Sequence, residues 1–321
     1  MRSWRTIFAL ALLAIAGGAH AQGAYPNRPI RVIVPFGPGG VTDILARLLA
    51  PDIQKDFGQP LLIENIGGAG GVIGTAAAAK AAPDGYTILF TSNVHSINPA
   101  LRKQLPFDAI KDFTPITLLV SSPNLLVVRT DSPFKSVADY LAAAKAKPGE
   151  VSYATAGLGT SLHIAGEQFS QLTGARFNHI PYSASNQSVQ AAAAGTTQSS
   201  WSAVNSALPM IKGGRLRALA VASPQRTGFL PDVPTFEEAG VKGMKSETWL
   251  GALGPGGLPA PIAAKWNAEL QKLINRPDIK EKILNLGAEP LGTELDKFGA
   301  LIKDEINMYS AIVRDGNIKP E

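Results

Sequence analysis

Short apolar runs, many of them β-branched, alternate along the chain with longer segments whose apolar residues recur at helical spacing. The short runs have the length and flanking turns of strands. They cover residues 30–35, 61–65, 87–92, 125–129, 152–155, 177–181, 198–202, 216–223 and 248–253. Helices are predicted at residues 43–55, 74–82, 137–146 and 161–172, the third with a capping pair of Ser136 and Asp139. Strand and helix alternating at this spacing predict an α/β fold with parallel sheets.

The C-terminal part of the chain has a different pattern. Three consecutive helices are predicted there, at residues 261–275, 278–286 and 294–314. The last of them carries one apolar stripe and a predicted cap of Thr293 with Asp296. The stripe consists of Leu295, Phe298, Leu301, Ile302, Ile306, Tyr309 and Ile312. We therefore expect this helix to pack on a domain formed by other segments.

Two glycine-rich turns, at residues 35–43 and 154–161, each follow a predicted strand and open a predicted helix. The first N–H groups of a helix lack partners within it and carry partial positive charge, so such a turn can hold a carboxylate or phosphate. Each is also an ordinary connection of an α/β fold. The hydroxyls of Thr42, Thr160 and Ser161 are suited both to a ligand and to capping their own helices.

The first residues have the layout of a secretory signal peptide. Arg2 and Arg5 precede an apolar run at residues 7–16, and small residues at Ala19 and Ala21 follow it. We predict that residues 1–21 are removed by cleavage after Ala21 and that the protein is periplasmic. The apolar run is shorter than the roughly 20 residues of a membrane-spanning helix.

Composition narrows the class of protein further. The 321 residues include no cysteine, so neither a disulfide nor a lipid-anchoring cysteine is available. A chain of this length can form two domains. Loss of Arg2 and Arg5 lowers the formal net charge from +5 to +3, and the remaining basic residues are dispersed. We therefore expect no nucleic-acid binding.

Several motifs occur in an order typical of one family. They read YPNRPIRVIVPF at 25–36, GGVTD at 39–43, APDGYT at 82–87, PFD at 106–108, KDF at 111–113, PDVPT at 231–235 and GAEP at 287–290. In these motifs the chain resembles the Bug family, the extracytoplasmic solute receptors of tripartite tricarboxylate transporters. The resemblance covers nearly the whole chain after the signal peptide.

The resemblance implies a type II periplasmic binding-protein fold, in which two α/β domains joined by two crossovers close on a small carboxylate. The crossovers are expected near residues 118–123 and 247–251. Domain 1 then comprises residues 22–122 plus 248–321, with the C-terminal helices, and domain 2 comprises residues 123–247. The implied partner is a membrane permease of the tripartite tricarboxylate type. We further expect a monomer without cofactor or metal.

In the family, the carboxylate lies between the strand-to-helix loops of the two domains, which correspond here to residues 36–43 and 156–163. We expect Asp43 to act as a partner of the helix dipole or to accept from a ligand-bound water or hydroxyl. Ser92, Asn93 and His95 follow a strand at an edge where open sheets bind ligands, although they also fit an ordinary loop. The candidate ligand-binding residues are Phe36, Gly39, Gly40, Thr42, Asp43, Ser92, Asn93, His95, Gly157, Thr160, Ser161, His163, Tyr182, Trp201 and Ser202.

Departures from the family pattern concern the second half of the pocket. Ser183, Ala184 and Ser185 stand where the family usually has Lys-Gly-Gly, and Ser202 follows Trp201 where the family has Asp after an aromatic residue. Leu158 stands where the turn often carries Asn. The ammonium group of an amino-acid ligand would need a carboxylate partner, so the absence of this Asp weakens the case for an amino acid. The sequence thus favours a carboxylate ligand whose far end is uncharged or aromatic.

Other functions receive less support. The glycines at residues 68–74 do not fit dinucleotide-binding spacing. Ser161 and His163 lack the Gly-x-Ser-x-Gly motif of a hydrolase, and the four histidines lack metal-ligand spacing. The sequence therefore predicts binding without catalysis. A protein that signals to a membrane sensor kinase through the same closure remains an alternative, as does a secreted hydrolase acting through Ser161.

Overall fold

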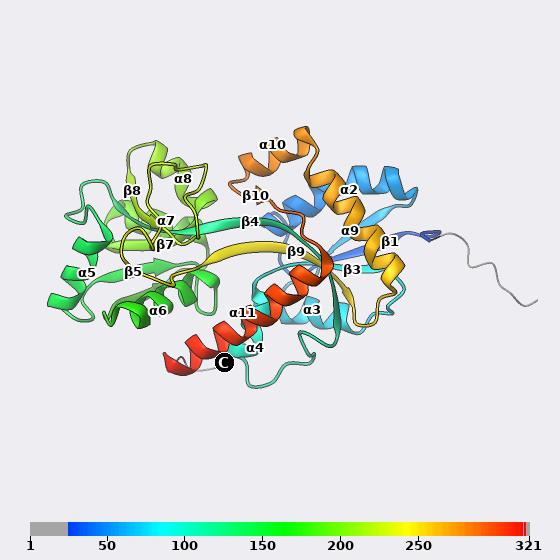
Figure 1. Ribbon diagram of the computed structural model, residues 1–321, viewed down its shortest axis with the longest axis horizontal. Coiled ribbons are helices and arrows are strands. Elements are labelled where there is room, and N and C mark those ends of the chain that lie inside the picture. Colours follow the sequence, from blue (N-terminus) through cyan, green and yellow to red (C-terminus); the bar gives the residue numbers. More distant parts are fainter. Residues whose placement is uncertain (1–24, 317, 319–321) are drawn as a thin grey trace, which may run out of the picture.

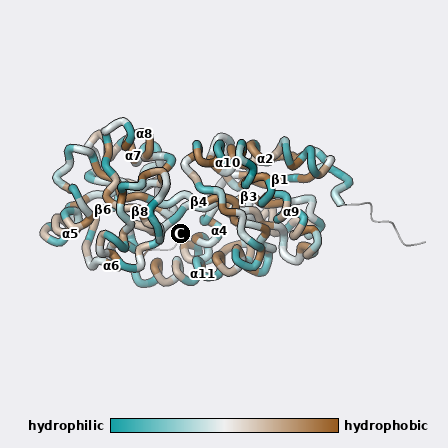
Figure 2. The backbone as a smooth tube through the Cα atoms, turned by 45° about the horizontal axis from the view of Figure 1, so that its top comes forward, coloured by the Kyte–Doolittle hydropathy of each residue, from teal (hydrophilic) through white to brown (hydrophobic). Residues whose placement is uncertain are grey.

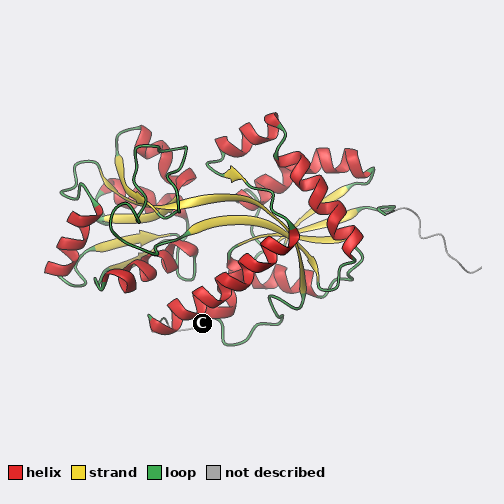
Figure 3. Ribbon diagram, viewed as in Figure 1, coloured by secondary structure: helices red, strands yellow, loops and turns green. Residues whose placement is uncertain are grey.

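The computed structural model describes residues 25–316 and 318, so the predicted signal peptide and its cleavage site lie outside the described residues. The described chain forms two lobes connected by two long, adjacent strands, β4 (Phe113–Arg129) and β9 (Glu247–Pro255) (Figures 1 and 3). The first lobe contains the N-terminal and C-terminal parts of the chain and the second contains the middle (Figure 1). Each lobe combines strands with covering helices, as the α/β prediction required.

The remaining strands divide between the lobes. The first lobe has β1 (Ile30–Val34), β2 (Leu61–Asn65), β3 (Thr87–Ser92) and β10 (Glu289–Pro290); the second has β5 (Ser152–Thr155), β6 (Asn178–Pro181), β7 (Ser199–Ala203) and β8 (Leu216–Val221). The strand order is β2-β1-β3-β9-β4-β7-β5-β6, with β8 and β10 also paired to β4. The pairs β1–β2, β1–β3, β5–β6 and β5–β7 are parallel, whereas every pair that includes β4 or β9 is antiparallel. The prediction of parallel sheets was therefore wrong for the pairs that include β4 or β9.

Strand direction places the loops of the two lobes opposite each other. Because β3 and β4 are both antiparallel to β9, β3 runs in the direction of β4, from the first lobe toward the second, and β1 is parallel to β3. β7 is antiparallel to β4, and β5 is parallel to β7, so both run back toward the first lobe. The loops after β1 and β5 consequently lie at the facing ends of the two lobes.

The helices cover both faces of the sheet in each lobe. They are α2 (Val41–Phe57), the 3-10 helix η2 (Ala69–Gly71), α3 (Val72–Ala79), α4 (Val94–Leu101), α5 (Val137–Ala146), α6 (Ser161–Thr173), α7 (Ser185–Ala194), α8 (Val204–Lys212), α9 (Ala260–Ile274), α10 (Pro277–Asn285) and α11 (Leu295–Asp315). The sequence pattern missed α4, α7 and α8. Proline inside α4 and α8, and serine and asparagine at the start of α7, weaken the helical signal. None of the helices in the described part of the chain combines the length and apolar character of a membrane span.

Apolar segments concentrate inside both lobes (Figure 2). In the first lobe, Trp266 of α9 packs with β1, α2 and α10, and Phe298 of α11 packs on the opposite face of the sheet. In the second lobe, Trp201 and Phe169 fill one face, and Val189 and Val204 fill the other. Complete burial of one such large side chain stabilises a fold by about 1.5–3 kcal/mol. Each lobe therefore has its own hydrophobic core.

The two predicted caps had different outcomes. Ser136 and Asp139 form the expected capping box at α5. Thr293 does not cap α11, whose first residue follows Glu294 with no side-chain cap. The Thr293 hydroxyl instead accepts from the backbone N–H of Leu118 at 3.1 Å. This residue therefore fastens the segment before α11 to β4, a contact that the local sequence cannot reveal.

Helix α11 contacts both lobes. Its residues Tyr309, Ile312 and Val313 join Ile97 of α4 and Ile164 of α6 in one apolar cluster. The side-chain amide of Gln171, at the far end of α6, donates to the carbonyl of Ile312 at 2.8 Å. The predicted domain boundaries, 122/123 and 247/248, fall within β4 and at the start of β9, and they stay a prediction.

Candidate ligand-binding site

The first glycine-rich turn leads directly into α2. Gly40 occupies the N-cap position with extended backbone (φ −71°, ψ 160°) and no side-chain cap. The N–H of Gly39 donates to Oδ2 of Asp43 at 2.9 Å, so the turn uses this donor itself. Because β1 and β2 are parallel, α2 runs back from the end of β1, so the N–H groups of its first residues, which lack partners within the helix, point toward the second lobe. The start of α2 is thus suited to receive an external anion.

Asp43 braces this turn. It is 3% exposed, and besides Gly39 it accepts from Nε of Arg47 at 3.0 Å and from Nδ2 of Asn65 at 3.0 Å. The same Asn65 amide also donates to the carbonyl of Phe36. The hydrogen bond from Arg47 is the main cause that lowers the pKa of Asp43 to about 2. Asp43 is therefore a carboxylate whose oxygens serve the turn and the end of β2.

The loop after β2 packs against the first turn. A Cβ on Gly67 would lie 3.5 Å from the backbone nitrogen of Gly37, and one on Gly71 would lie 3.4 Å from the ring of Phe36. Gly71 also has a left-handed backbone (φ 88°), which favours glycine. Both distances are ordinary van der Waals contacts, so this loop lies directly against the first turn, and the backbone conformation of Gly71 is what favours glycine there.

The second turn is fixed by its own side chains. Gly157 and Gly159 have φ of 120° and 70°, and Leu158 between them is 62% exposed. The Thr160 hydroxyl donates to the carbonyl of Gly157 at 2.8 Å and accepts from the N–H of His163 at 3.3 Å. Thr160 is therefore the N-cap of α6, and its hydroxyl hydrogen is already donated within the turn.

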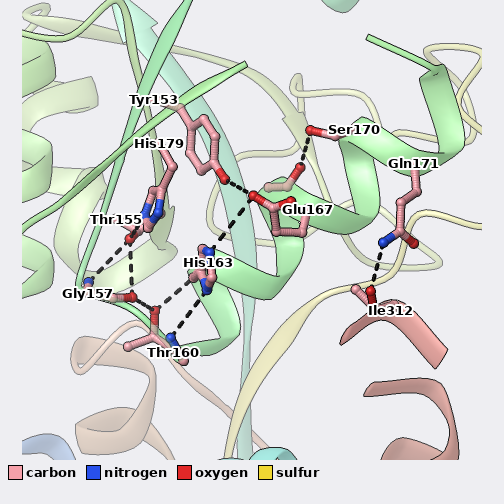
Figure 4. A network of polar contacts seen from close by, with 12 residues as sticks. Tyr153, Thr155, Gly157, Thr160, His163, Glu167, Ser170, Gln171, His179 and Ile312 are labelled. Atoms are coloured by element: carbon pink, nitrogen blue, oxygen red, sulfur yellow. Dashed lines mark hydrogen bonds and ion pairs between the residues drawn. The ribbon is translucent and has the colours of Figure 1, made fainter. Parts of the chain in front are cut away.

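His163 closes a network behind the turn (Figure 4). Its Nδ1 accepts from the N–H of Gly159 at 3.2 Å, and its Nε2 lies 3.8 Å from Oε1 of Glu167. Glu167 accepts from the hydroxyl of Tyr153 at 2.8 Å. The ring of His179 stacks on His163 at 4.4 Å. Burial lowers the pKa of both imidazoles, that of His179 to about 4.

Ser161 connects α6 to the strands between the lobes. Its hydroxyl lies 3.0 Å from that of Thr248 on β9, and Thr248 donates to Oδ1 of Asn124 on β4 at 3.1 Å. Because Thr248 has a single hydroxyl hydrogen, Ser161 must be the donor in their contact. Asn93 similarly donates to the carbonyl of Glu247 at 2.9 Å. The starts of α4 and α6 are thus both fastened to the beginning of β9.

Helix α4 contacts both turns. A Cβ on Gly159 would lie 2.9 Å from Cδ1 of Leu101, so the second turn rests on the end of α4. At 3.1 Å, Asn98 donates to the carbonyl of Gly70, in the loop beside the first turn. The structure therefore connects the two turns through a helix that the sequence pattern missed.

Three candidates lie in lobe cores. His95 is 1% exposed, with Nε2 2.8 Å from the carbonyl of Ala109, and burial lowers its pKa to about 4. Trp201 is 1% exposed and stacks on Phe236. Ser202 is completely buried, and its hydroxyl has no hydrogen-bond partner among the described residues. His95 lies in α4, so the alternative of an ordinary loop does not describe it.

Two further candidates, Ser92 and Tyr182, lie where strands end on the facing sides of the lobes. Ser92 ends β3, and Tyr182 follows β6 with its N–H bonded to the carbonyl of Thr155 at 3.0 Å. Sequence reasoning missed Asn65, Glu167 and Thr248 as supports. Asn65 alone had a usable signal, because it ends a strand next to β1.

The sequence was compared with known protein families. A family model described as "Tripartite tricarboxylate transporter family receptor" matches residues 45–318. The chain belongs to this family. Its members are periplasmic solute receptors, and the resemblance in the sequence motifs is confirmed. Among the described residues of the receptor, no group of three or more His, Asp or Glu side chains is arranged to hold a metal ion.

Individual relatives are similar over most of the receptor. Protein BugT of Bordetella pertussis is 35% identical, covering 96% of this chain and 95% of its own. Rpa4515 of R. palustris, solved with adipate, is 30% identical with a TM-score of 0.80, covering 92% of this chain and 100% of its own. MatC of Rhodopseudomonas palustris, solved with bound malate, is 32% identical with a TM-score of 0.75, covering 90% and 100%. The periplasmic-binding-protein fold is therefore confirmed.

Proposed function

We propose that the receptor captures a small carboxylate between the two glycine-rich turns and delivers it to a membrane permease of the tripartite tricarboxylate type. The observation that carries this proposal is the facing arrangement of the loops after β1 and β5, the first of which leads into a helix with no side-chain cap. Family membership and the carboxylates bound by Rpa4515 and MatC support the ligand class.

The proposed contacts differ in kind from residue to residue. Backbone N–H groups at Gly40, Thr42 and Ser161 bind the carboxylate, since the starts of α2 and α6 present them. Asp43, Thr160 and His163 hold the turns, because their polar atoms are engaged there. Phe36, Gly39, Ser92, Asn93, Gly157 and Tyr182 complete the wall of the site. His95 and Trp201 are left out because their rings pack against Phe113 and Phe236 inside the lobes, and Ser202 because it is completely buried beside Trp201.

We also propose that the far end of the ligand is uncharged. Leu158 presents an exposed aliphatic side chain at the tip of the second turn. Ser183, in place of a family lysine, donates its hydroxyl to Oε1 of Gln187 at 2.7 Å. Monocarboxylic acids with an apolar body should therefore bind more tightly than tricarboxylates or acidic amino acids.

A thermal-shift screen tests the ligand class. The chain from Gln22 onward, unfolded and refolded to remove bound solute, is mixed with monocarboxylates, dicarboxylates, tricarboxylates, aromatic acids and amino acids. A ligand at about 100 times its Kd stabilises by about 2.7 kcal/mol, which raises Tm by several degrees. Absence of any shift across the carboxylates would contradict the proposal.

The variant Gly40→Asp separates loss of binding from loss of folding. The backbone of Gly40 suits an aspartate N-cap, and a Cβ there would meet only the carbonyl of Gly37, at 3.5 Å. The added carboxylate should stabilise α2 and occupy or repel the anion site. We expect unchanged or higher Tm without ligand and loss of the ligand shift, with Gly40→Asn as the uncharged control. Retained binding in Gly40→Asp would move the site away from α2.

We also propose that the receptor is exported to the periplasm and that it is a monomer. Signal-peptide cleavage after Ala21 would be read from the N-terminal sequence of the exported protein. A monomer would be established by light scattering. Capture of the permease membrane subunits by the ligand-loaded receptor, with weaker capture by the ligand-free receptor, would support delivery.

A further inference from the structure

The second turn depends on one imidazole nitrogen that carries no proton. The N–H of Gly159 donates to Nδ1 of His163 at 3.2 Å (Figure 4). A ring nitrogen that accepts a hydrogen bond is unprotonated, so a neutral His163 must carry its hydrogen on Nε2. That nitrogen faces Oε1 of Glu167 at 3.8 Å. The network therefore specifies both the charge and the tautomer of His163.

The second turn needs such a hydrogen bond because two of its residues are glycines. Gly157 and Gly159 occupy left-handed conformations that they share with many alternatives, so the backbone alone does not select this shape. The bonds that select it are those of Gly157 with Thr155 and Thr160, and that of Gly159 with His163. His163 is the titratable side chain that accepts directly from the backbone of the turn.

The surroundings of His163 favour the neutral form. His163 is 5% exposed, stacks on His179 of β6, and is the third residue of α6, where the helix dipole disfavours a positive charge. Glu167 opposes this preference from the same helix, and Tyr153 of β5 shares the Glu167 carboxylate. On the side of α11, Tyr309, Ile312 and Val313 surround Ile164. Burial is the larger effect and lowers the pKa of His163.

We propose that His163 is a positioning residue whose neutral imidazole holds the second turn in its carboxylate-binding shape, so that ligand affinity falls when His163 is protonated. This inference rests on the proposed function. Protonation would place an Nδ1–H donor against the Gly159 N–H donor and break their bond. If His163 were instead a cationic contact of the ligand, acidification would increase affinity, so the two roles predict opposite signs.

Two substitutions of His163 test the role of its Nδ1 as a hydrogen-bond acceptor. In His163→Asn, Oδ1 takes the place of Nδ1 as acceptor and does not titrate, so the turn should persist at every pH. In His163→Phe, the ring remains but the acceptor is lost, and we expect about tenfold weaker binding across the pH range. Glu167→Gln retains an acceptor for Tyr153 and removes the charge that raises the pKa of His163. Its loss of affinity should therefore begin at lower pH than in the wild type.

The first readout needs no ligand. Nitrogen-15 NMR of the histidine-labelled protein should show His163 with hydrogen on Nε2 at neutral pH. In glycine-labelled protein, the Gly159 amide signal should shift below pH 6.5 in the wild type but stay in place in His163→Asn. Hydrogen on Nδ1 at neutral pH, or equal Gly159 shifts in both proteins, would overturn the inference.

The second readout is calorimetric titration, from pH 8 down to the lowest pH at which the wild type stays folded, with the carboxylate that gives the largest thermal shift. Affinity of the wild type should fall on acidification while that of His163→Asn changes only as the ligand itself titrates. Identical pH profiles, or rising affinity in acid, would overturn the inference. Failure of every carboxylate to bind would contradict the proposed function alone, since the NMR readout still reports on the turn.

Discussion

The backbone N–H of Gly39 donates to the carboxylate of Asp43 across the first turn of α2, at 2.9 Å. This bond fixes the glycine-rich turn from within its own helix. Substitution Asp43→Asn should weaken ligand binding and lower the free energy of unfolding by about 1–3 kcal/mol, because an amide NH2 would then face the donors of Arg47 or Asn65. Urea denaturation and calorimetric titration measure the two effects.

Arg47 provides the matched control for Asp43. Its side chain is 53% exposed, and ion pairs of such residues contribute about 0–1 kcal/mol. Arg47→Met should destabilise less than Asp43→Asn, because Gly39 and Asn65 still donate to the Asp43 carboxylate. Equal losses in Asp43→Asn and Arg47→Met would mean that Asp43 acts through the ion pair and does not brace the turn.

Approach of the two lobes depends on Gly287, in the turn before β10. Gly287 has φ of 70°, and a Cβ there would lie 2.6 Å from Cα and Cβ of Asn205 at the start of α8. Gly287→Ala should force the lobes apart, giving a larger radius of gyration in X-ray scattering. We also expect weaker ligand binding, because the proposed site lies between the lobes.

Gly240→Ala separates this steric effect from backbone strain. Gly240 has φ of 88° but no atom within 4 Å of a Cβ position. Both variants bear the roughly 1–2 kcal/mol cost of a left-handed alanine. Only Gly287→Ala should change the scattering profile, and an equal change in Gly240→Ala would argue against lobe separation.

A buried carboxyl next to the interlobe strands should make stability depend on pH. Glu305 of α11 is 9% exposed and accepts from the indole N–H of Trp249 at 2.9 Å, and burial raises its pKa from 4.5 to about 7. Because the folded pKa is raised, the stabilisation is complete below pH 4.5 and is lost as pH rises through 7.

Glu305→Gln measures this contribution. Its amide oxygen still accepts from Trp249, and the side chain stays neutral. Between pH 5 and 8 the unfolding free energy of the wild type should fall by an amount on the order of 1–3 kcal/mol more than that of Glu305→Gln. Parallel pH profiles from guanidinium titrations would show that Glu305 does not titrate in this range.

The contact of Ser161 with Thr248 should couple α6 to β9. Ser161→Ala and Thr248→Val each remove one hydroxyl, and Thr248→Val leaves the Ser161 hydroxyl without its acceptor at a cost of about 1–3 kcal/mol. A double-mutant cycle should give a coupling energy above about 0.5 kcal/mol. Strict additivity would indicate that the hydroxyls do not interact in solution.

Most strands and several helices followed directly from residue pattern. The run of residues 30–35 became β1 at Ile30–Val34, and Ser136 with Asp139 capped α5 as predicted. Local information suffices there, because periodicity and caps involve neighbours in sequence. The pattern predicted only residues 125–129 of β4, since Pro115 and Pro123 interrupt the part of the strand before residue 125. Pairing with β9 keeps those residues extended.

The candidate ligand-binding residues stay a prediction, but the structure shows what some of their side chains contact. Thr160 and Asp43 lie in the turns that the sequence singled out, yet their hydrogen bonds serve the turns themselves. A hydroxyl or carboxylate at a helix start has the same sequence signature in either role. Only the positions of Gly157, Gly39 and Asn65 decide between them.

The sequence by itself determined two glycine-rich turns at strand ends, an α/β chain and the family to which it belongs, because these depend on local spacing and on motifs along the chain. The tertiary structure decided that β1 and β5 point toward each other, that His95 and Trp201 lie in lobe cores, and that Ser161 bonds to Thr248. These outcomes depend on strand direction and on contacts between residues far apart in sequence, which no local pattern encodes.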